Sequence, residues 1–441
     1  MTSPLLDRDA TRPAFDADYL DQLLARGIQV IRVIHADLFG RQRGKQYPVS
    51  SLPGLAKGIA YSKMANAEDL LGVPVDEKEF PALANHPDQH AYLDMDTAFV
   101  PPWESDSLWV LARLSEDGKP SALCPRSQLA AATARLHEDL GLRAVAAGEP
   151  EFYLFRKDGT GSRTPYAPDG VSYTMDRITD PDGAVGRIHR QLIEMNIGVT
   201  VVNREFSPGQ FEINLAHNEA LSAADSAFLL KTGIKELAVI EGLEANFMAK
   251  PVTGEEGSSL HVHLSLWQED ENVFAAPDGA LSPAALAAIA GIQQHAPAIM
   301  AFAAPTVNSY KRLTGNGLSP RTSNWGEDNR FTFVRVPAER GGATRLELRA
   351  GDASASSHLL MAAMIHAAAD GIRRGLVPDE AGKPLPRSLG ESVAALEADE
   401  VLRAGFGDEF TAVYAALKRR EIEAFEATVT DWEWNLYRRH V

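Results

Sequence analysis

The sequence predicts an α+β protein with a small mixed N-terminal domain and a larger domain of strands and helices. The chain has 441 residues, which is too long for one simple core. The loop-rich segment over residues 58–102 ends in a double proline, which is typical of a domain edge. Beyond it, short strands and helical segments follow one another. We therefore expect a loose tail over residues 1–17, a small domain over residues 18–105 and a large domain over residues 106–441.

The expected elements can be taken in chain order. Residues 28–38 are rich in β-branched side chains and predict a strand, and residues 45–49 predict a second one. Pro125 suits the first turn of a helix, which we expect to run to residue 140. Residues 160–182 are rich in Gly, Pro and Asp and predict a loop. Further helices are expected over residues 183–196, 220–243, 283–301, 354–373 and 406–439.

Composition and charge narrow the class of protein. The net charge of −17 disfavours nucleic acid as a partner and suits a site that collects metal cations. Cys124 is the single cysteine, so an internal disulfide is impossible. The first residues lack the apolar run of a signal peptide, and the apolar stretch over residues 284–304 is broken by polar residues and Pro297. These features predict a cytoplasmic protein without a membrane span.

Four short strands each place their polar residues on one face, because residues i and i+2 point the same way. Each strand alone also fits an antiparallel sheet with one solvated face. Together, however, these faces hold Glu, His and Arg and no lysine, which indicates a site. The shared faces carry Glu149 with Glu151, Glu212 with Asn214, His261 with His263 and Ser265, and Arg345 with Glu347 and Arg349. Residues 199–205 are expected to form a hairpin with the strand at residues 210–215.

These faces predict a site for two or more metal ions. Oxygen-rich ligation with one imidazole suits Mg²⁺ or Mn²⁺, whereas Zn²⁺ prefers more nitrogen or sulfur. Without metal, converging carboxylates repel one another, which raises their pKa values. The expected ligands are Glu149, Glu151, Glu205, Glu212, Glu347 and His261.

Arginines complete the constellation. Guanidinium groups grip carboxylates and phosphates in a bidentate manner, and metals with arginines supply what phosphoryl transfer needs. Arg330 and Arg335 are an odd number of residues apart, so a regular strand cannot point both inward. Either a bulge intervenes or one of them is structural. The arginines concerned are Arg312, Arg330, Arg335, Arg345 and Arg349.

The chain resembles the glutamine synthetase family at five stretches that occur in the family order. The resemblance covers most of residues 105–375, and residues 37–45 resemble the family's N-terminal domain. It implies a small β-grasp domain, a catalytic domain with a curved antiparallel sheet flanked by helices, and a ring, usually a dodecamer, with active sites between subunits. The five stretches are residues 148–155, 209–212, 257–265, 308–313 and 345–349.

The resemblance also implies roles by position. The chemistry that the resemblance implies is phosphorylation of the glutamate γ-carboxylate by ATP to an acyl phosphate, which an amine then attacks. One metal would be held by Glu151, Glu205 and Glu212, and the other by Glu149, His261 and Glu347. Glutamate would be bound by Gly257, Arg312 and Arg349, with Glu256 nearby, and Glu205 could help to deprotonate the amine. Arg330 and Arg335 would stabilise the phosphoryl group, and the nucleotide would lie near His263, Ser265, Arg335 and Arg345.

Departures from the family pattern concern the amine. Family members that use ammonium have an aspartate in the N-terminal domain, where this chain has Ala60, and a glutamate where it has Leu318. Glu256 stands where an asparagine is common. A small cation needs negative charge nearby, so the pattern favours the γ-glutamylamine branch, with a polyamine or a short monoamine as substrate. An ammonium-using glutamine synthetase and a non-catalytic family member remain as alternatives.

Overall fold

The computed structural model describes residues 15, 17–157, 159, 161, 163–314 and 318–441. The expected tail lies almost wholly outside these residues. The first sheet is six-stranded, in the order β2-β1-β5-β4-β3, and β6 pairs with β5. Its strands are β1 (Val30–Ala36), β2 (Gln42–Pro48), β3 (Ile59–Ser62), β4 (Asp88–Leu93), β5 (Ser107–Glu116) and β6 (Lys119–Pro120), with the short helices α1 (Ala17–Ala25) and α2 (Leu52–Leu55).

This first sheet lies where the small mixed domain was expected, and it reaches beyond residue 105. β5 pairs in parallel with β1 and antiparallel with β4, so it is a central strand. A boundary after residue 105 would separate β5 and β6 from their partners. We propose that the domain boundary lies between β6 and α3 (Pro125–Leu140).

The second sheet has ten strands in the order β14-β15-β16-β12-β7-β9-β8 and carries the candidate site. β10 and β11 also pair with β7, and β13 with β12. The pairing is antiparallel except between β14 and β15, and the expected β8–β9 hairpin is confirmed. The strands are β7 (Arg143–Arg156), β8 (Val199–Arg204), β9 (Gln210–Leu215), β10 (Asn218–Glu219), β11 (Leu243–Asn246), β12 (Leu260–Gln268), β13 (Glu271–Asn272), β14 (Trp325–Glu327), β15 (Val334–Val336) and β16 (Leu346–Leu348).

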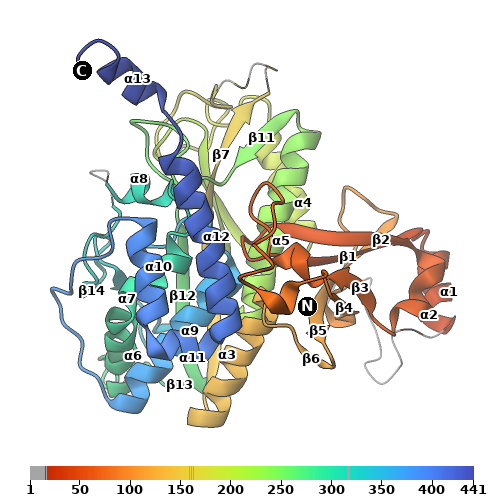
Figure 1. Ribbon diagram of the computed structural model, residues 1–441, viewed down its shortest axis with the longest axis horizontal. Coiled ribbons are helices and arrows are strands. Elements are labelled where there is room, and N and C mark those ends of the chain that lie inside the picture. The colour runs from red at the N-terminus through yellow and green to blue at the C-terminus, as the bar shows by residue number, and fades with distance from the viewer. Residues whose placement is uncertain (1–14, 16, 158, 160, 162, 315–317) are drawn as a thin grey trace.

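Helices pack around this sheet and supply most of its core (Figure 1). The expected helix at residues 283–301 is two helices bent by 74°, because Pro297 starts a new first turn. The C-terminal region is likewise divided between α12 and α13. The helices are α3, α4 (Ala184–Glu194), α5 (Ala220–Ile240), α6 (Pro283–Gln294), α7 (Ala296–Ala303), α8 (Ser309–Leu313), α9 (Ser357–Arg374), α10 (Leu389–Ala398), α11 (Glu400–Phe406), α12 (Asp408–Glu426) and α13 (Asp431–Tyr437).

Helices α6 and α9 approach closely because two glycines face each other. A Cβ at Gly291 would collide with the carbonyl of Ala367, and one at Gly371 with that of Ala287. Since α9 is buried along most of its length, this contact fixes it beneath the sheet. Helix α9 therefore supports the strands that present the site.

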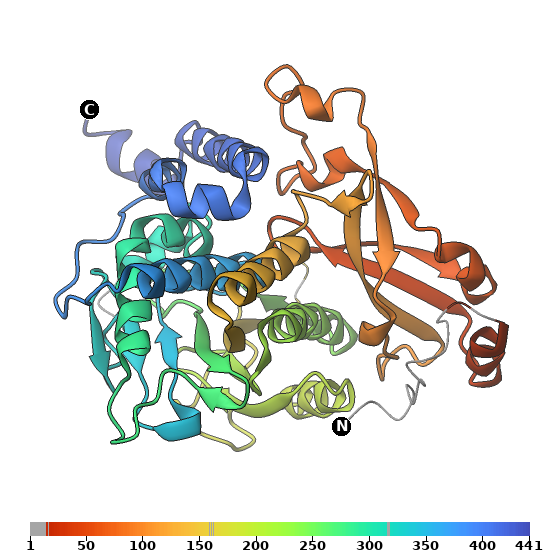
Figure 2. The ribbon, with the colours of Figure 1, turned by 90° about the horizontal axis from the view of Figure 1, so that it is seen from below.

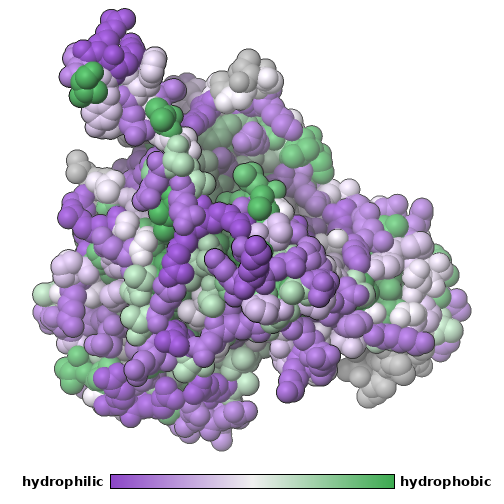
Figure 3. Space-filling model, in the orientation of Figure 1, coloured by the Kyte–Doolittle hydropathy of each residue, from purple (hydrophilic) through white to green (hydrophobic). Residues whose placement is uncertain are grey.

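The hydrophilic surface and the short apolar helices fit the charge and hydrophobic content of the sequence. The face shown in Figure 3 is mainly hydrophilic, with scattered apolar patches. Within the described part of the chain, no single helix has both the length and the apolar character to cross a membrane. Among the residues that the structure describes, the bent pair α6 and α7 alone reaches that length and apolar character, and most of its residues are buried in the protein core.

Candidate active site

Strand register brings the predicted residues together. On the two sides of β7, Glu149 faces His261 of β12 and Glu151 faces Glu212 of β9. Further along, His263 of β12 faces Glu347 of β16, and Glu347 faces Arg335 of β15. Neighbouring side chains on one sheet face lie about 5 Å apart. The polar residues that alternate along each strand thus lie side by side on one face of the sheet.

These residues line a cavity of about 600 Å³. Ser265 is the exception among the predicted site residues: it lies on β12 outside this lining, where its Oγ accepts a hydrogen bond from Trp267 Nε1 at 2.9 Å. The predicted residues in the lining are Glu149, Glu151, Glu205, Glu212, Glu256, Gly257, His261, His263, Arg312, Leu318, Arg330, Arg335, Arg345, Glu347 and Arg349.

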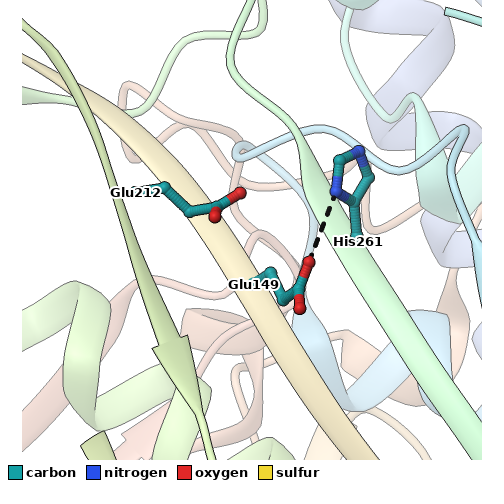
Figure 4. Close-up of side chains that lie close together, drawn as sticks. All are labelled: Glu149, Glu212 and His261. Atoms are coloured by element: carbon teal, nitrogen blue, oxygen red, sulfur yellow. Dashed lines mark ion pairs between the residues drawn. The ribbon is translucent and has the colours of Figure 1, made fainter. Parts of the chain in front are cut away.

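Two groups of side chains in this cavity could hold a cation. Glu149, Glu212 and His261 can place one ligand atom each within 4.8 Å of one another, and so can Glu149, His263 and Glu347. Figure 4 shows the first group converging from three strands, with His261 Nδ1 3.7 Å from Glu149 Oε2. His263 Nε2 is closer still, at 3.1 Å from Glu149 Oε1. These groups differ from the implied grouping, because Glu149 is shared by both and His263 joins one of them.

Glu151 and Glu205 are held by neighbours that the sequence did not single out. Glu151 Oε2 accepts hydrogen bonds from the Ser259 amide at 2.9 Å and from Gln210 Nε2 at 3.0 Å. Glu205 Oε1 accepts from Asn203 Nδ2 at 2.8 Å. These donors fix the two carboxylates on the cavity wall. Gln210 and Asn203 lie on the strands around Glu205, which is the only signal for them in the sequence.

Two carboxyl groups show the expected effect of crowding. Burial, together with the charge of Glu151, raises the pKa of Glu205 to about 7. Burial and the surrounding carboxylates, Glu151 first, raise the pKa of Glu212 to about 9. A divalent cation supplies the positive charge that these groups lack. The donor set, rich in oxygen with imidazole nitrogens, therefore fits Mg²⁺ or Mn²⁺.

The pKa values of two further carboxyl groups, Glu149 and Glu347, are lowered instead of raised. Burial alone would raise the pKa of Glu149, but hydrogen bonds and charge from His261 and His263 outweigh it and hold the pKa well below its usual range. Burial of Glu347 is likewise opposed by these histidines and by Arg349, which lowers its pKa to about 2. Repulsion among carboxylates thus raises the pKa values of Glu205 and Glu212, whereas hydrogen bonds and charge from the histidines outweigh it at Glu149.

The arginines surround the carboxylates. Arg335 reaches Glu347 Oε2 at 2.7 Å and Asp328 Oδ1 at 2.6 Å. Arg349 also pairs with Glu347 and donates to the Arg330 carbonyl at 2.9 Å. Arg330 lies outside the strand, in the turn before β15, and still lines the cavity, so no bulge is needed for it to point there. A loop residue is free of the strand alternation, so spacing along the chain could not place it.

The glutamate-binding residues predicted from the resemblance lie together at one end. Arg312 is buried and donates to Ser259 Oγ at 2.8 Å and to the Ala350 carbonyl at 3.1 Å. A Cβ at Gly257 would collide with the Ala249 carbonyl and with the side chain of Arg312. Glycine at this position thus leaves the space that Arg312 occupies.

Exposed aromatic residues also line the cavity, and the sequence did not predict them. Tyr173, Phe206 and Phe331 all line it, and they are 65%, 56% and 66% exposed. Phe206 directly follows Glu205, and Phe331 directly follows Arg330, so adjacency to site residues was the available signal. Together with Leu318, they give a charged cavity an apolar part.

Comparison with known proteins places this fold and site. Residues 122–437 match the family described as the glutamine synthetase catalytic domain. A glutamine synthetase of Pyrococcus horikoshii is 33% identical, covering 93% of this chain and 96% of its own length. A glutamate–isopropylamine ligase of Pseudomonas sp. is also 33% identical, covering 95% of this chain and 96% of its own.

Solved structures show the same likeness. One described as apo GmaS without ligand has a TM-score of 0.85 and 30% identity, covering 96% of this chain and 99% of its own. A GmaS complex with ADP has a TM-score of 0.84 and 30% identity, covering 94% of this chain and 98% of its own. The chain is therefore a glutamine synthetase-like ligase. It belongs to the glutamine synthetase family, whose members use ATP and divalent metal ions.

Proposed function

We propose that this protein uses ATP to join an organic amine to the γ-carboxylate of glutamate by way of γ-glutamyl phosphate. The observation that carries the proposal is the apolar part of the cavity, formed by Leu318, Tyr173, Phe206 and Phe331. The likeness to a glutamate–isopropylamine ligase and to GmaS supports it.

In this proposal the two carboxylate–histidine groups hold Mg²⁺ or Mn²⁺, and Glu149 contributes to both. Metal ions held there would supply positive charge to neutralise the phosphate groups. Arg330 and Arg335 stabilise the phosphoryl group, and Arg312, Arg349 and Gly257 position glutamate. Glu205 accepts a proton from the attacking amine. The nucleotide lies towards His263 and Arg345, whose side chains are 3.2 Å apart. Ser265, outside the cavity lining, stays a prediction.

The preference for an organic amine follows from charge. Each carboxylate lost near a desolvated cation costs about 1–3 kcal/mol of binding. Leu318 cannot supply that charge, but apolar contact returns about 0.8 kcal/mol for each buried methylene. Aromatic faces also attract an alkylammonium ion. Ammonium has no methylene to bury, so its binding free energy is reduced more than that of an organic amine.

The same argument favours a short monoamine over a polyamine. A polyamine needs acidic groups for its distal charges, and four acidic residues of the N-terminal domain are the candidates for that role. Three of the four are already paired within the chain, with Arg43, His86 and Arg420. The four are Glu68, Asp69, Asp76 and Glu77.

We propose further that the active site is completed in a ring-shaped homo-oligomer of the dodecameric type. Among the described residues, the cavity lining extends from Glu149 to Arg349, so the first sheet of the same chain adds nothing to it. Ala60, the counterpart of the ammonium-binding aspartate, lies on β3 at the edge of that sheet. Light scattering on the active protein should give a ring-sized particle, and a fully active monomer would refute this assembly.

The experiment that tests the activity is ADP formation with glutamate, ATP and a series of amines. We expect glutamate and an amine to be required together. Turnover with ammonium alone as the preferred amine would instead favour the ammonium-using alternative, which the Pyrococcus relative supports. Absence of ADP formation with every amine would favour a non-catalytic role.

A further inference from the structure

A second cavity, of about 440 Å³, lies where the first sheet meets the helices. Its walls come from the loop after β1, from α5, from the segment after β11 and from α12. It shares no lining residue with the candidate active site among the residues that the structure describes. Figures 1 and 2 show loops of the first sheet beside α12, and Lys63 of that domain pairs with Glu409 of α12 at 2.6 Å.

Lys418 at the base of this cavity is a buried cation, and the charges of Glu421, Asp352 and Asp37 offset its burial only in part. Its side chain is 1% exposed, and its Nζ lies 4.4 Å from the ring centre of Phe39 and 5.0 Å from that of Tyr414. Within the described chain, it has aromatic faces but neither a hydrogen bond nor an ion pair. A buried ammonium is costly without a partner. Burial accordingly lowers the pKa of Lys418 to about 8.

Two more lysines line the same cavity from α5. Lys231 Nζ donates to the Ala353 carbonyl at 2.8 Å and lies 5.4 Å from the ring centre of Phe247. Lys235 Nζ lies 5.7 Å from the same ring. Burial, helped by the charge of Lys235, lowers the pKa of Lys231 to about 7. An anion between these groups would stabilise the charged form of each lysine.

The acidic groups nearby, Glu421, Asp352 and Asp37, favour the charged form of Lys418 but form no ion pair with it among the described residues. Asp37 is engaged by Arg41 at 2.8 Å and by Arg43 at 3.2 Å. Glu421 lines the cavity, and its Oε1 accepts from the Val307 amide at 2.8 Å. Its other oxygen is buried and has no hydrogen-bond partner among the described residues. Glu421 Oε2 can therefore accept a hydrogen bond from a ligand.

We infer that this cavity binds a small organic anion, a carboxylate or phosphate on a planar ring that also carries an N–H group. The anionic end meets Lys418, Lys231 and Lys235, and the ring rests on Phe39 and Phe247. The N–H group donates to the free oxygen of Glu421. Burial of charge between ammonium groups and of a ring between aromatic faces are both favourable. Cavities of this size hold molecules of that kind.

The test is isothermal titration calorimetry of the intact protein with 4-aminobenzoate and 4-aminophenyl phosphate as probes. The neutral 4-aminobenzamide is the control ligand. We expect saturable binding of at least one anionic probe and none of the amide. Lys418→Met should weaken binding by roughly ten- to a hundred-fold, since it removes one charge-assisted contact. Lys57→Met, at an exposed lysine outside the cavity, should leave binding unchanged.

If Lys418→Met fails to fold, as judged by circular dichroism, the exposed Lys235→Met decides, with a loss of about ten-fold expected. Absence of binding for both anions up to about 10 mM would overturn the inference. Equal affinity in the wild type and the lysine variant would overturn it as well. Which anion binds more tightly identifies the carboxylate or the phosphate as the preferred end.

Discussion

Glu149→Gln is the most informative single substitution, because Glu149 belongs to both three-residue groups of the candidate metal site. The change keeps the shape of the side chain and removes one negative charge from each group. Two unit charges about 4 Å apart interact by about 4 kcal/mol at the effective dielectric of a protein surface. Part of this is offset by desolvation, so we expect a loss of roughly 2–3 kcal/mol per metal site, or about a hundred-fold in affinity.

The assay is Mn²⁺ binding by isothermal titration calorimetry, followed by ADP formation at saturating metal. Glu149→Gln should weaken Mn²⁺ binding and lower kcat/KM by about a thousand-fold or more, since transition-state charge is then poorly neutralised. Glu244→Gln, at an exposed glutamate on β11, is the matched control and should bind Mn²⁺ as the wild type does. Mn²⁺ affinity unchanged in Glu149→Gln would refute the assignment of both groups.

Three further predictions concern substrate and stability. Gly257→Ala should raise the KM for glutamate by about ten- to a hundred-fold in steady-state assays, because the new Cβ displaces Arg312; an unchanged KM would remove Gly257 from that site. Leu318→Glu should raise kcat/KM for ammonium by about ten-fold in the coupled ADP assay, and a decrease would contradict the assigned position. His295 lies between Asp370 and Asp399; burial opposes its protonation, but Asp399 and then Asp370 raise its pKa. Stability from charged His295 is therefore complete below its ordinary pKa and lost as pH rises through the raised value. Asp399→Asn should cost more unfolding free energy, about 1–3 kcal/mol, at about pH 6 than at about pH 9 in urea titrations, whereas an equal loss at both would exclude this linkage.

Much of the fold could be predicted because local rules decided it. Pro125 opens α3 and the helix ends at residue 140, as expected, and Cys124 is buried as a small apolar residue. The single helix expected at residues 283–301 failed because Pro297 favours a new start over a continuous turn. The extent of the first sheet could not be read from the double proline, since β5 pairs with β1 across a long stretch of chain. Long-range pairing of this kind has no local signature.

The candidate site was predictable in membership but not in detail. Alternation along each strand placed Glu149 and His261 on polar faces, but only the register shows that they face one another. The resemblance implies that His263 lies near the nucleotide. In the structure, His263 also lies beside Glu149. Loop residues such as Arg330 and Phe206 follow no periodicity, so their place at the cavity depends on the tertiary fold alone.

The central claim is the preference for an organic amine, and one measurement tests it directly. This is kcat/KM for ammonium, isopropylamine, ethanolamine, putrescine and spermidine, determined as ADP formation with saturating glutamate and ATP. We predict that a short monoamine exceeds ammonium by about ten-fold or more, because it buries methylenes against Leu318 and the aromatic residues. If ammonium matches or exceeds every organic amine, the claim is wrong and the protein is an ordinary glutamine synthetase.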